Sequence, residues 1–135
     1  MGGRTYVLAS LAERLTGQIL DGIIYILILM VPAILSALFL PGWLVGVAGV
    51  IVAGLYLLFQ DGLGAGESYG KRIVRTRVID ATTGASCTFF QSLVRNLLLV
   101  ILGFIDWMFI LIGSRRQRLG DRAAGTVVVK LEEPL

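Results

Sequence analysis

The sequence predicts an all-α membrane protein that carries a small cytoplasmic β-sheet. Among its 135 residues, 56% are hydrophobic and only 16% are charged, and the mean hydropathy is +0.85, well above that of soluble domains. Two apolar runs, residues 19–40 and 43–59, are each long enough to cross a bilayer as a helix. We therefore expect two transmembrane helices, followed by a third, shorter hydrophobic helix.

Capping signals locate the starts of two of these helices. Ser10 with Glu13 forms a capping box that begins the first helix ahead of its apolar run, and Thr88 with Gln91 forms a second box ahead of the third helix. The expected hydrophobic helices cover about residues 12–40, 43–60 and 89–113, within a single domain of residues 1–135.

Two short segments outside the apolar runs have the pattern of β-strands. Residues 73–80 alternate basic and aliphatic side chains, and residues 126–131 are rich in β-branched residues. The first segment lies in the polar loop 61–88 and the second in the tail 114–135. We expect the two strands to pair into a small sheet in the cytoplasm.

The placement of basic residues predicts how the chain is oriented. Arg4 and Arg14 precede the first span, and no charge lies between the spans. A second group of basic residues follows the second span: Lys71, Arg72, Arg75 and Arg77. Because basic residues collect on the cytoplasmic side, we expect a multi-pass protein of the cell membrane whose N-terminus and loop 61–88 are cytoplasmic.

The third hydrophobic segment, residues 97–113, allows two topologies. Asp106 lies inside it, and four arginines follow: Arg115, Arg116, Arg118 and Arg122. A straight crossing would export all four, so we favour a broken or re-entrant helix that bends at residues 103–106 and returns the tail to the cytoplasm. A plain crossing stays an alternative, because the segment is just long enough to span.

Charged residues inside apolar runs are the candidate functional site. Arg14 and Asp21 lie about two turns apart on one side of the first helix, and Arg95 lies about three turns before Asp106. An aspartate at membrane depth costs roughly 2.5 to 3.5 kcal/mol, so it must face protein, a cation or water. We expect these four residues to form either an ion or proton site or a buried ion-pair cluster.

Several motifs together resemble the RDD family of small membrane proteins. They are Arg14 with Asp21 in the first helix, Gly70-Lys71-Arg72 in the loop, Arg95 before the third helix, and a tail motif that includes Arg118, Gly120, Asp121 and Gly125. The family is named after one arginine and two aspartates, and the first two map onto Arg14 and Asp21. The second aspartate maps onto Asp106 by depth or onto Asp121 by the tail motif, and we prefer Asp106.

The resemblance implies a transport function for some ligand or ion. In the first hypothesis, Asp21 and Asp106 exchange a proton for a monovalent cation while Arg14 tunes the site. A divalent cation would require more oxygen ligands. Because so short a chain hardly encloses a path alone, we expect a homo-oligomer. In the alternative, the protein is a membrane scaffold or adaptor, its charged cluster is structural, and its basic tail binds a partner protein or anionic lipid.

Other classes of protein find little support in the sequence. The chain has no histidine and a single cysteine, Cys87, which excludes an internal disulfide and a Cys/His metal site. The glycine-rich loop 61–71 does not match a phosphate-binding loop, since Arg72 stands where a serine or threonine is needed. We expect no enzyme activity, no cofactor, no metal and no nucleic-acid partner.

Overall fold

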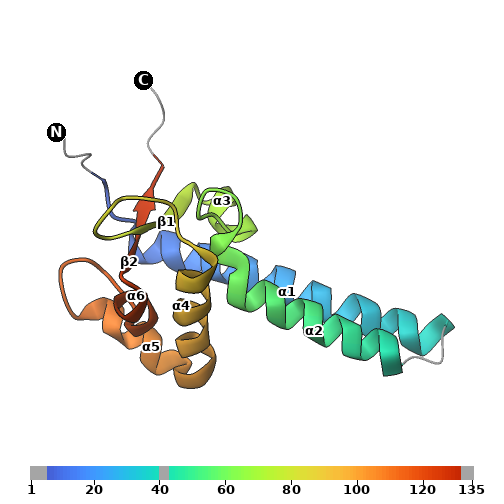
Figure 1. Ribbon diagram of the computed structural model, residues 1–135. Coiled ribbons are helices and arrows are strands. Elements are labelled where there is room, and N and C mark those ends of the chain that lie inside the picture. Colours follow the sequence, from blue (N-terminus) through green and yellow to red (C-terminus); the bar gives the residue numbers. More distant parts are fainter. Residues whose placement is uncertain (1–5, 40–42, 132–135) are drawn as a thin grey trace.

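Two long helices run side by side and carry a head of shorter elements at one end (Figure 1). This computed structural model describes residues 6–39 and 43–131. The hairpin consists of α1 (Leu11–Phe39) and α2 (Trp43–Phe59), which a 3-10 helix, η1 (Gln60–Gly62), extends. Arg4, residue 40 of the predicted first span and the end of the predicted tail lie outside the described residues.

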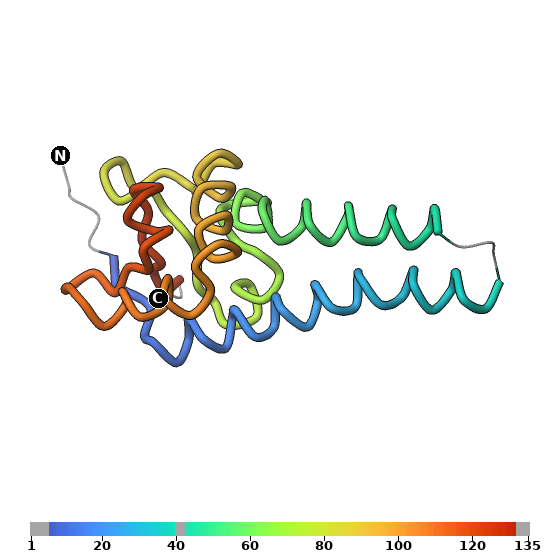
Figure 2. Tube along the Cα trace, turned by 90° about the horizontal axis from the view of Figure 1, so that it is seen from below, coloured from blue at the N-terminus to red at the C-terminus, as the bar shows by residue number. Residues whose placement is uncertain are grey.

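The head consists of short helices around a two-stranded sheet. Its elements are α3 (Tyr69–Ile73), β1 (Thr76–Asp80), α4 (Phe89–Leu102), α5 (Phe104–Met108), η2 (Phe109–Leu111), α6 (Leu119–Ala124) and β2 (Thr126–Lys130). Figure 2 shows the hairpin extending well beyond this head, with the N-terminal end of α1 lying against it.

Both predicted capping boxes are confirmed. The Ser10 hydroxyl accepts from the Glu13 amide at 3.1 Å, and the Glu13 carboxylate accepts from the Ser10 amide at 2.8 Å. Thr88 and Gln91 make the same reciprocal pair at 3.2 and 3.1 Å. These bonds satisfy amides that the first helical turn leaves unpaired, which fixes where α1 and α4 begin.

The hairpin exposes most of its apolar side chains. Its two helices touch closely where Gly49 meets Pro32, since a Cβ at residue 49 would lie 3.0 Å from that of Pro32. Elsewhere many of the leucine, isoleucine and valine side chains of α1 and α2 are about half exposed. Both helices, with η1 included, are long and apolar enough to cross a membrane. So large an apolar surface is typical of a membrane protein.

The third hydrophobic segment is broken at Gly103. This residue has φ +54° and ψ −122°, which a residue with a side chain rarely adopts, and it ends α4 and begins α5. The axes on either side of the break are bent by 112°. The bend lies where the sequence predicted it, and it separates the helix faces of Arg95 and Asp106, which would coincide only in a continuous helix.

The predicted sheet is confirmed, although its first strand is shorter than expected. β1 and β2 are antiparallel, with Val78 opposite Val128. The residues before Thr76, which we assigned to the strand, instead end α3 and form a turn. Leu8, ahead of α1, forms a bridge to Val129. The segments before α1, after α2 and after α5 therefore meet at one end of the hairpin.

A small core lies under the sheet. Ala9, Val78, Cys87 and Val128 pack together and are almost fully buried. Burial raises the pKa of the Cys87 thiol to about 11, so the thiolate is scarce at neutral pH.

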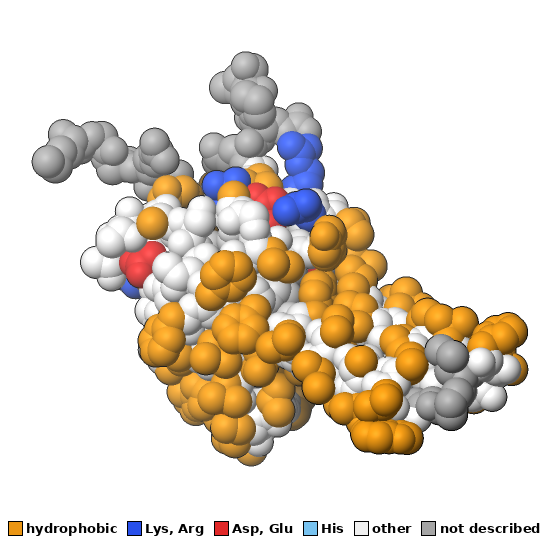
Figure 3. Space-filling view, turned by 45° about the vertical axis from the view of Figure 1, so that its right-hand side comes forward, with side chains coloured by type: hydrophobic (Ala, Val, Ile, Leu, Met, Phe, Trp, Pro, Cys, Tyr) orange, Lys and Arg blue, Asp and Glu red, His pale blue; other side chains and the backbone are white. Residues whose placement is uncertain are grey.

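Charged and apolar side chains gather on different parts of the surface. Figure 3 shows apolar side chains over the hairpin and the lower part of the head, and charged side chains at the end where the sheet lies. The bent segment contributes exposed side chains such as Ile101, Phe104 and Leu111. In Figure 1 the α4–α5 segment runs in a different direction from the hairpin. The molecule therefore has two apolar parts, the hairpin and the α4–α5 segment, and one polar end.

Candidate functional site: a buried network of ion pairs

Eight buried charged side chains form one continuous network between the hairpin and the head. Its carboxylates are Asp21, Asp61, Asp106 and Asp121, and its cations are Arg14, Lys71, Arg95 and Arg118. Each residue is at most 7% exposed. Four negative and four positive charges balance, as burial requires, because an unpaired buried charge is very costly.

The first helix presents Asp21 to the start of α3. One carboxylate oxygen accepts hydrogen bonds from the Gly70 amide at 2.8 Å and the Tyr56 hydroxyl at 3.0 Å, and the other accepts one from the Ser68 hydroxyl. Ser68 is also the N-cap of α3. A side chain at residue 70 would overlap the carbonyl oxygen of Gly17, so only glycine brings this amide to the carboxylate.

Lys71 connects Asp21 to a second carboxylate, Asp61. Its ammonium nitrogen lies 2.6 Å from an Asp61 oxygen and 3.6 Å from an Asp21 oxygen. Asp61 sits in η1, directly after α2, where its amide donates to the Ser92 hydroxyl at 3.2 Å. The Asn96 side chain donates to its carboxylate at 3.0 Å. A single ammonium thus lies between two buried carboxylates.

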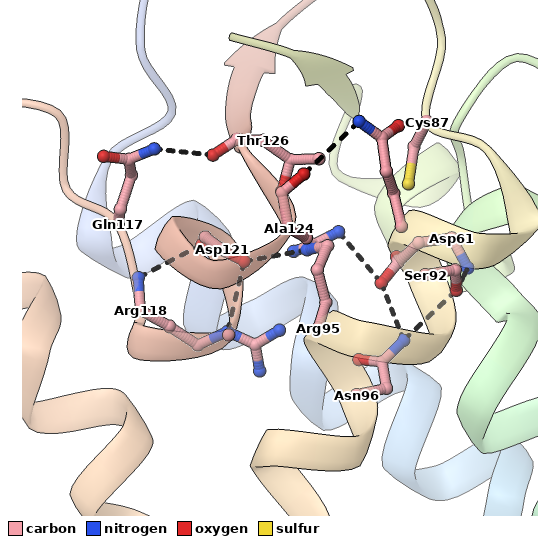
Figure 4. A network of polar contacts seen from close by, with 12 residues as sticks. Asp61, Cys87, Ser92, Arg95, Asn96, Gln117, Arg118, Asp121, Ala124 and Thr126 are labelled. Carbon is pink, nitrogen blue, oxygen red and sulfur yellow. Dashed lines mark hydrogen bonds and ion pairs between the residues drawn. The ribbon is translucent and has the colours of Figure 1, made fainter.

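Arg95 carries the network from the hairpin into the head. Its Nη1 lies 3.0 Å from an Asp61 oxygen, and its Nε lies 2.8 Å from an Asp121 oxygen. Figure 4 shows the guanidinium between these two carboxylates, which come from opposite sides. Because Asp61 follows α2, Arg95 belongs to α4 and Asp121 to α6, this one side chain links three elements.

Asp121 is surrounded by arginines. It accepts from Arg14 Nη2 at 2.5 Å and from the backbone amide of Arg118 at 3.1 Å, in addition to its bond with Arg95. Burial alone would raise the pKa of Asp121, but the three guanidinium groups outweigh burial and hold it well below its usual range. Arg14 also donates to the carbonyl of Arg116, which ties α1 to the loop before α6.

Asp106 ends the network in the bent segment. It accepts from the Gly120 amide at 2.7 Å and lies 3.6 Å from Arg118 Nε. A side chain at residue 120 would overlap the carbonyl oxygen of Arg95. Gly120 therefore has the same role in α6 as Gly70 has in α3. Each glycine places its backbone amide against the carboxylate of an aspartate from an apolar helix.

The structure includes all four predicted site residues in the network but pairs them differently. Arg14 pairs with Asp121 rather than with Asp21, which lies on its own helix. Arg95 pairs with Asp61 and Asp121, not with Asp106. Asp21 and Asp106 do not form a two-carboxylate site: among the described residues they share no cation, and they occupy opposite ends of the network.

The role of Asp61 was not predicted from the sequence, where this residue begins the polar loop 61–88. Lys71 and Asp121 were predicted only as parts of a loop motif and a tail motif, not as partners of the charges in the apolar runs. A signal was present: Gly70-Lys71-Arg72 is followed by Thr76 at the start of a strand, and the same spacing recurs at Gly120-Asp121-Arg122 and Thr126. The loop motif and the tail motif are therefore equivalent parts of the site.

An apolar hairpin, a bent hydrophobic helix and a balanced buried charge network define a small helical domain of the membrane-protein type. The model of the RDD family matches residues 8–125. The chain belongs to the RDD family.

Curated relatives are longer than this chain. A proline-rich antigen homolog of Mycobacterium tuberculosis is 33% identical over 95 residues, which cover 66% of this chain and 38% of that protein. An uncharacterized protein of Rickettsia prowazekii, RP437, is 40% identical over 65 residues, which cover 48% of this chain and 37% of that protein. The chain thus spans less than two fifths of these relatives. No solved structure matches it.

The close contact at Gly70 yields a testable prediction. Gly70→Ala should lower the melting temperature in detergent, with a loss of stability of about 2 kcal/mol or more, because a Cβ there displaces α3 from Asp21 and disturbs an ion pair. Gly22→Ala is the matched control, since nothing lies within 4 Å of a Cβ at that residue of α1. Equal melting temperatures for the two variants would contradict the packing described here.

Proposed function

We propose that this protein exchanges a monovalent cation for a proton across a membrane, at a site formed by Asp21, Lys71 and Asp61. The observation that carries the proposal is the Lys71 ammonium, held 2.6 and 3.6 Å from two buried carboxylates. This revises the hypothesis from the sequence, in which Asp106 was the second carboxylate.

Lysine gives this part of the network a chemistry that the rest lacks. A buried lysine can release a proton, whereas an arginine stays charged. If Lys71 becomes neutral, the network holds one excess negative charge, which a monovalent cation can balance. Carboxylate oxygens of Asp21 and Asp61 and the hydroxyls of Ser68 and Tyr56 are available as ligands. One proton leaves for each cation bound, so the exchange is neutral at the site.

The arginine part of the network is suited to a structural role. Arg14, Arg95 and Arg118 surround Asp121, whose pKa is held far below its usual range. None of these groups changes its charge at neutral pH. They keep α1, α4 and α6 in place while the lysine part exchanges ions. We assign Asp106 to this structural part, through its contact with Arg118.

The same proposal includes a topology for the bent segment. Two spans return the chain to the side on which it began, and β2 then pairs with β1 and with Leu8 on that side. A third crossing would separate these strands by a bilayer. The 112° bend supports a re-entrant segment, and the basic loop and tail support a cytoplasmic location of the sheet. A transport path through so small a chain implies a homo-oligomer of the hairpins.

A second candidate function is that of a membrane scaffold or anchor. It is favoured by the complete charge balance of the network and by the relatives, of which the chain covers only 38% and 37%. A domain found within longer proteins can serve to hold other segments at a membrane. In this case the whole network is structural and no ion moves.

Flux measurements distinguish the two candidates. Lys71→Arg keeps the positive charge but removes the exchangeable proton, so we expect cation-driven proton movement in proteoliposomes to fall at least tenfold while the protein stays folded. Arg72→Lys, at a side chain that is 52% exposed, is the matched control and should keep the wild-type rate. Full flux in Lys71→Arg, or no flux with sodium, potassium or lithium in the wild type, would leave the scaffold as the better account.

Single-cysteine labelling tests the topology. The native thiol is buried, and burial raises its pKa to about 11, so it should stay unlabelled at pH 7. We expect an impermeant maleimide to label Thr83→Cys and Ser114→Cys from the cytoplasmic side, and Phe39→Cys, at the far end of the hairpin, from the opposite side. Labelling of Ser114→Cys together with Phe39→Cys would show that the third segment crosses.

A further inference from the structure

A small cavity lies at the centre of the ion-pair network, where the hairpin, the sheet and the bent segment meet. Four cationic side chains line it: Arg14, Lys71, Arg95 and Arg118. Gln18 and Thr76 add polar groups, and Trp107 and Val128 complete the wall. The volume is about 10 Å³, which is the space needed by one water-sized particle.

Several buried donors around this cavity lack a partner. Arg14 Nε, Arg118 Nη1 and the Thr76 hydroxyl are buried and make no hydrogen bond within the described part of the chain. The nearby Asp121 carboxylate does not pair with these atoms. It accepts instead from Arg14 Nη2 and from the backbone amide of Arg118. Because buried polar groups are nearly always paired, the particle in this cavity must accept hydrogen bonds.

The charge around the cavity restricts the occupant further. None of the four network carboxylates is among the described residues that line it. The four cations are therefore the charged groups that border the cavity, while the carboxylates that pair with them in the balanced network do not line it, which favours an anion over a cation at short range. A cation is disfavoured there, and a cavity of about 10 Å³ suits a monatomic ion better than the larger phosphate or sulfate. We propose that this cavity binds one small monatomic anion of the size and charge of chloride.

This proposal does not rest on the proposed cation exchange, although Lys71 lines the cavity and also lies between Asp21 and Asp61. The exchange uses the oxygen atoms of Asp21 and Asp61, whereas the anion would be held by nitrogen donors and by the Thr76 hydroxyl. A failure of the anion test leaves the prediction for Lys71→Arg flux unchanged, and the reverse also holds.

The two strands offer a matched pair of variants. Thr76 and Thr126 each begin a strand, are at most 1% exposed, and carry a buried hydroxyl without a partner among the described residues. Thr76 lines the cavity and Thr126 does not. Replacement by valine keeps the shape and removes only the hydroxyl, so any cost of a buried valine should be similar in both.

Thermal unfolding in detergent tests the proposal, with sodium chloride compared against sodium gluconate at equal ionic strength. We expect chloride to raise the melting temperature of the wild type and of Thr126→Val in a saturable manner. In Thr76→Val the apparent affinity for chloride should fall at least tenfold. Equal melting temperatures in the two salts would mean that the cavity holds only water, and an undiminished chloride effect in Thr76→Val would mean that the anion binds elsewhere. Either result overturns the proposal.

A second measurement needs no variant. Crystals of the wild type grown in sodium bromide should give an anomalous peak between the guanidinium groups of Arg14 and Arg118. Anomalous maps with no peak in the cavity would contradict the proposal even if Thr76→Val failed to fold.

Discussion

The fold depends on Arg95, whose guanidinium holds Asp61 on one side and Asp121 on the other. Through these two bonds, the end of α2 is joined to α4 and α4 to α6. Loss of one partner of a buried pair typically costs about 3–5 kcal/mol, because a charge is left without compensation. The head has two small apolar clusters around its sheet, and we expect its position against the hairpin to rely strongly on this network.

Two similar structural units supply the charges on either side of Arg95. In each unit a glycine amide meets an aspartate from an apolar helix, at 2.8 Å for Gly70 with Asp21 and 2.7 Å for Gly120 with Asp106. A strand follows each glycine after the same number of residues, and the two strands pair with each other. The units differ at the next residue, which is Lys71 in one and Asp121 in the other. That difference places an ammonium between two carboxylates in the first unit and a carboxylate among three guanidinium groups in the second.

Local features of this fold and the pairing of its two strands could be predicted from the sequence, and the long-range ion pairs could not. The hydrophobic helices and their capping boxes follow from neighbouring residues. The break near Gly103 was favoured over a plain crossing because of the arginines that follow the segment, and the structure has it as a 112° bend. Helical periodicity showed that Arg14 and Asp21 share a side of α1, but their partners are set by how α3 and α6 pack. Arg14 meets Asp121 across a separation of 107 residues, and no local pattern contains that contact. Asp61 was missed because it closes an apolar helix and resembles a loop residue.

The central claim is that buried charge pairs hold the head on the hairpin, and a double-mutant cycle between Arg14 of α1 and Asp121 of α6 tests it most directly. Free energies of unfolding would be measured for the wild type, Arg14→Met, Asp121→Asn and the double variant in one detergent. We predict that the two changes are not additive, with a coupling of about 1–3 kcal/mol, as for directly interacting residues. Additivity to within about 0.5 kcal/mol would contradict the account.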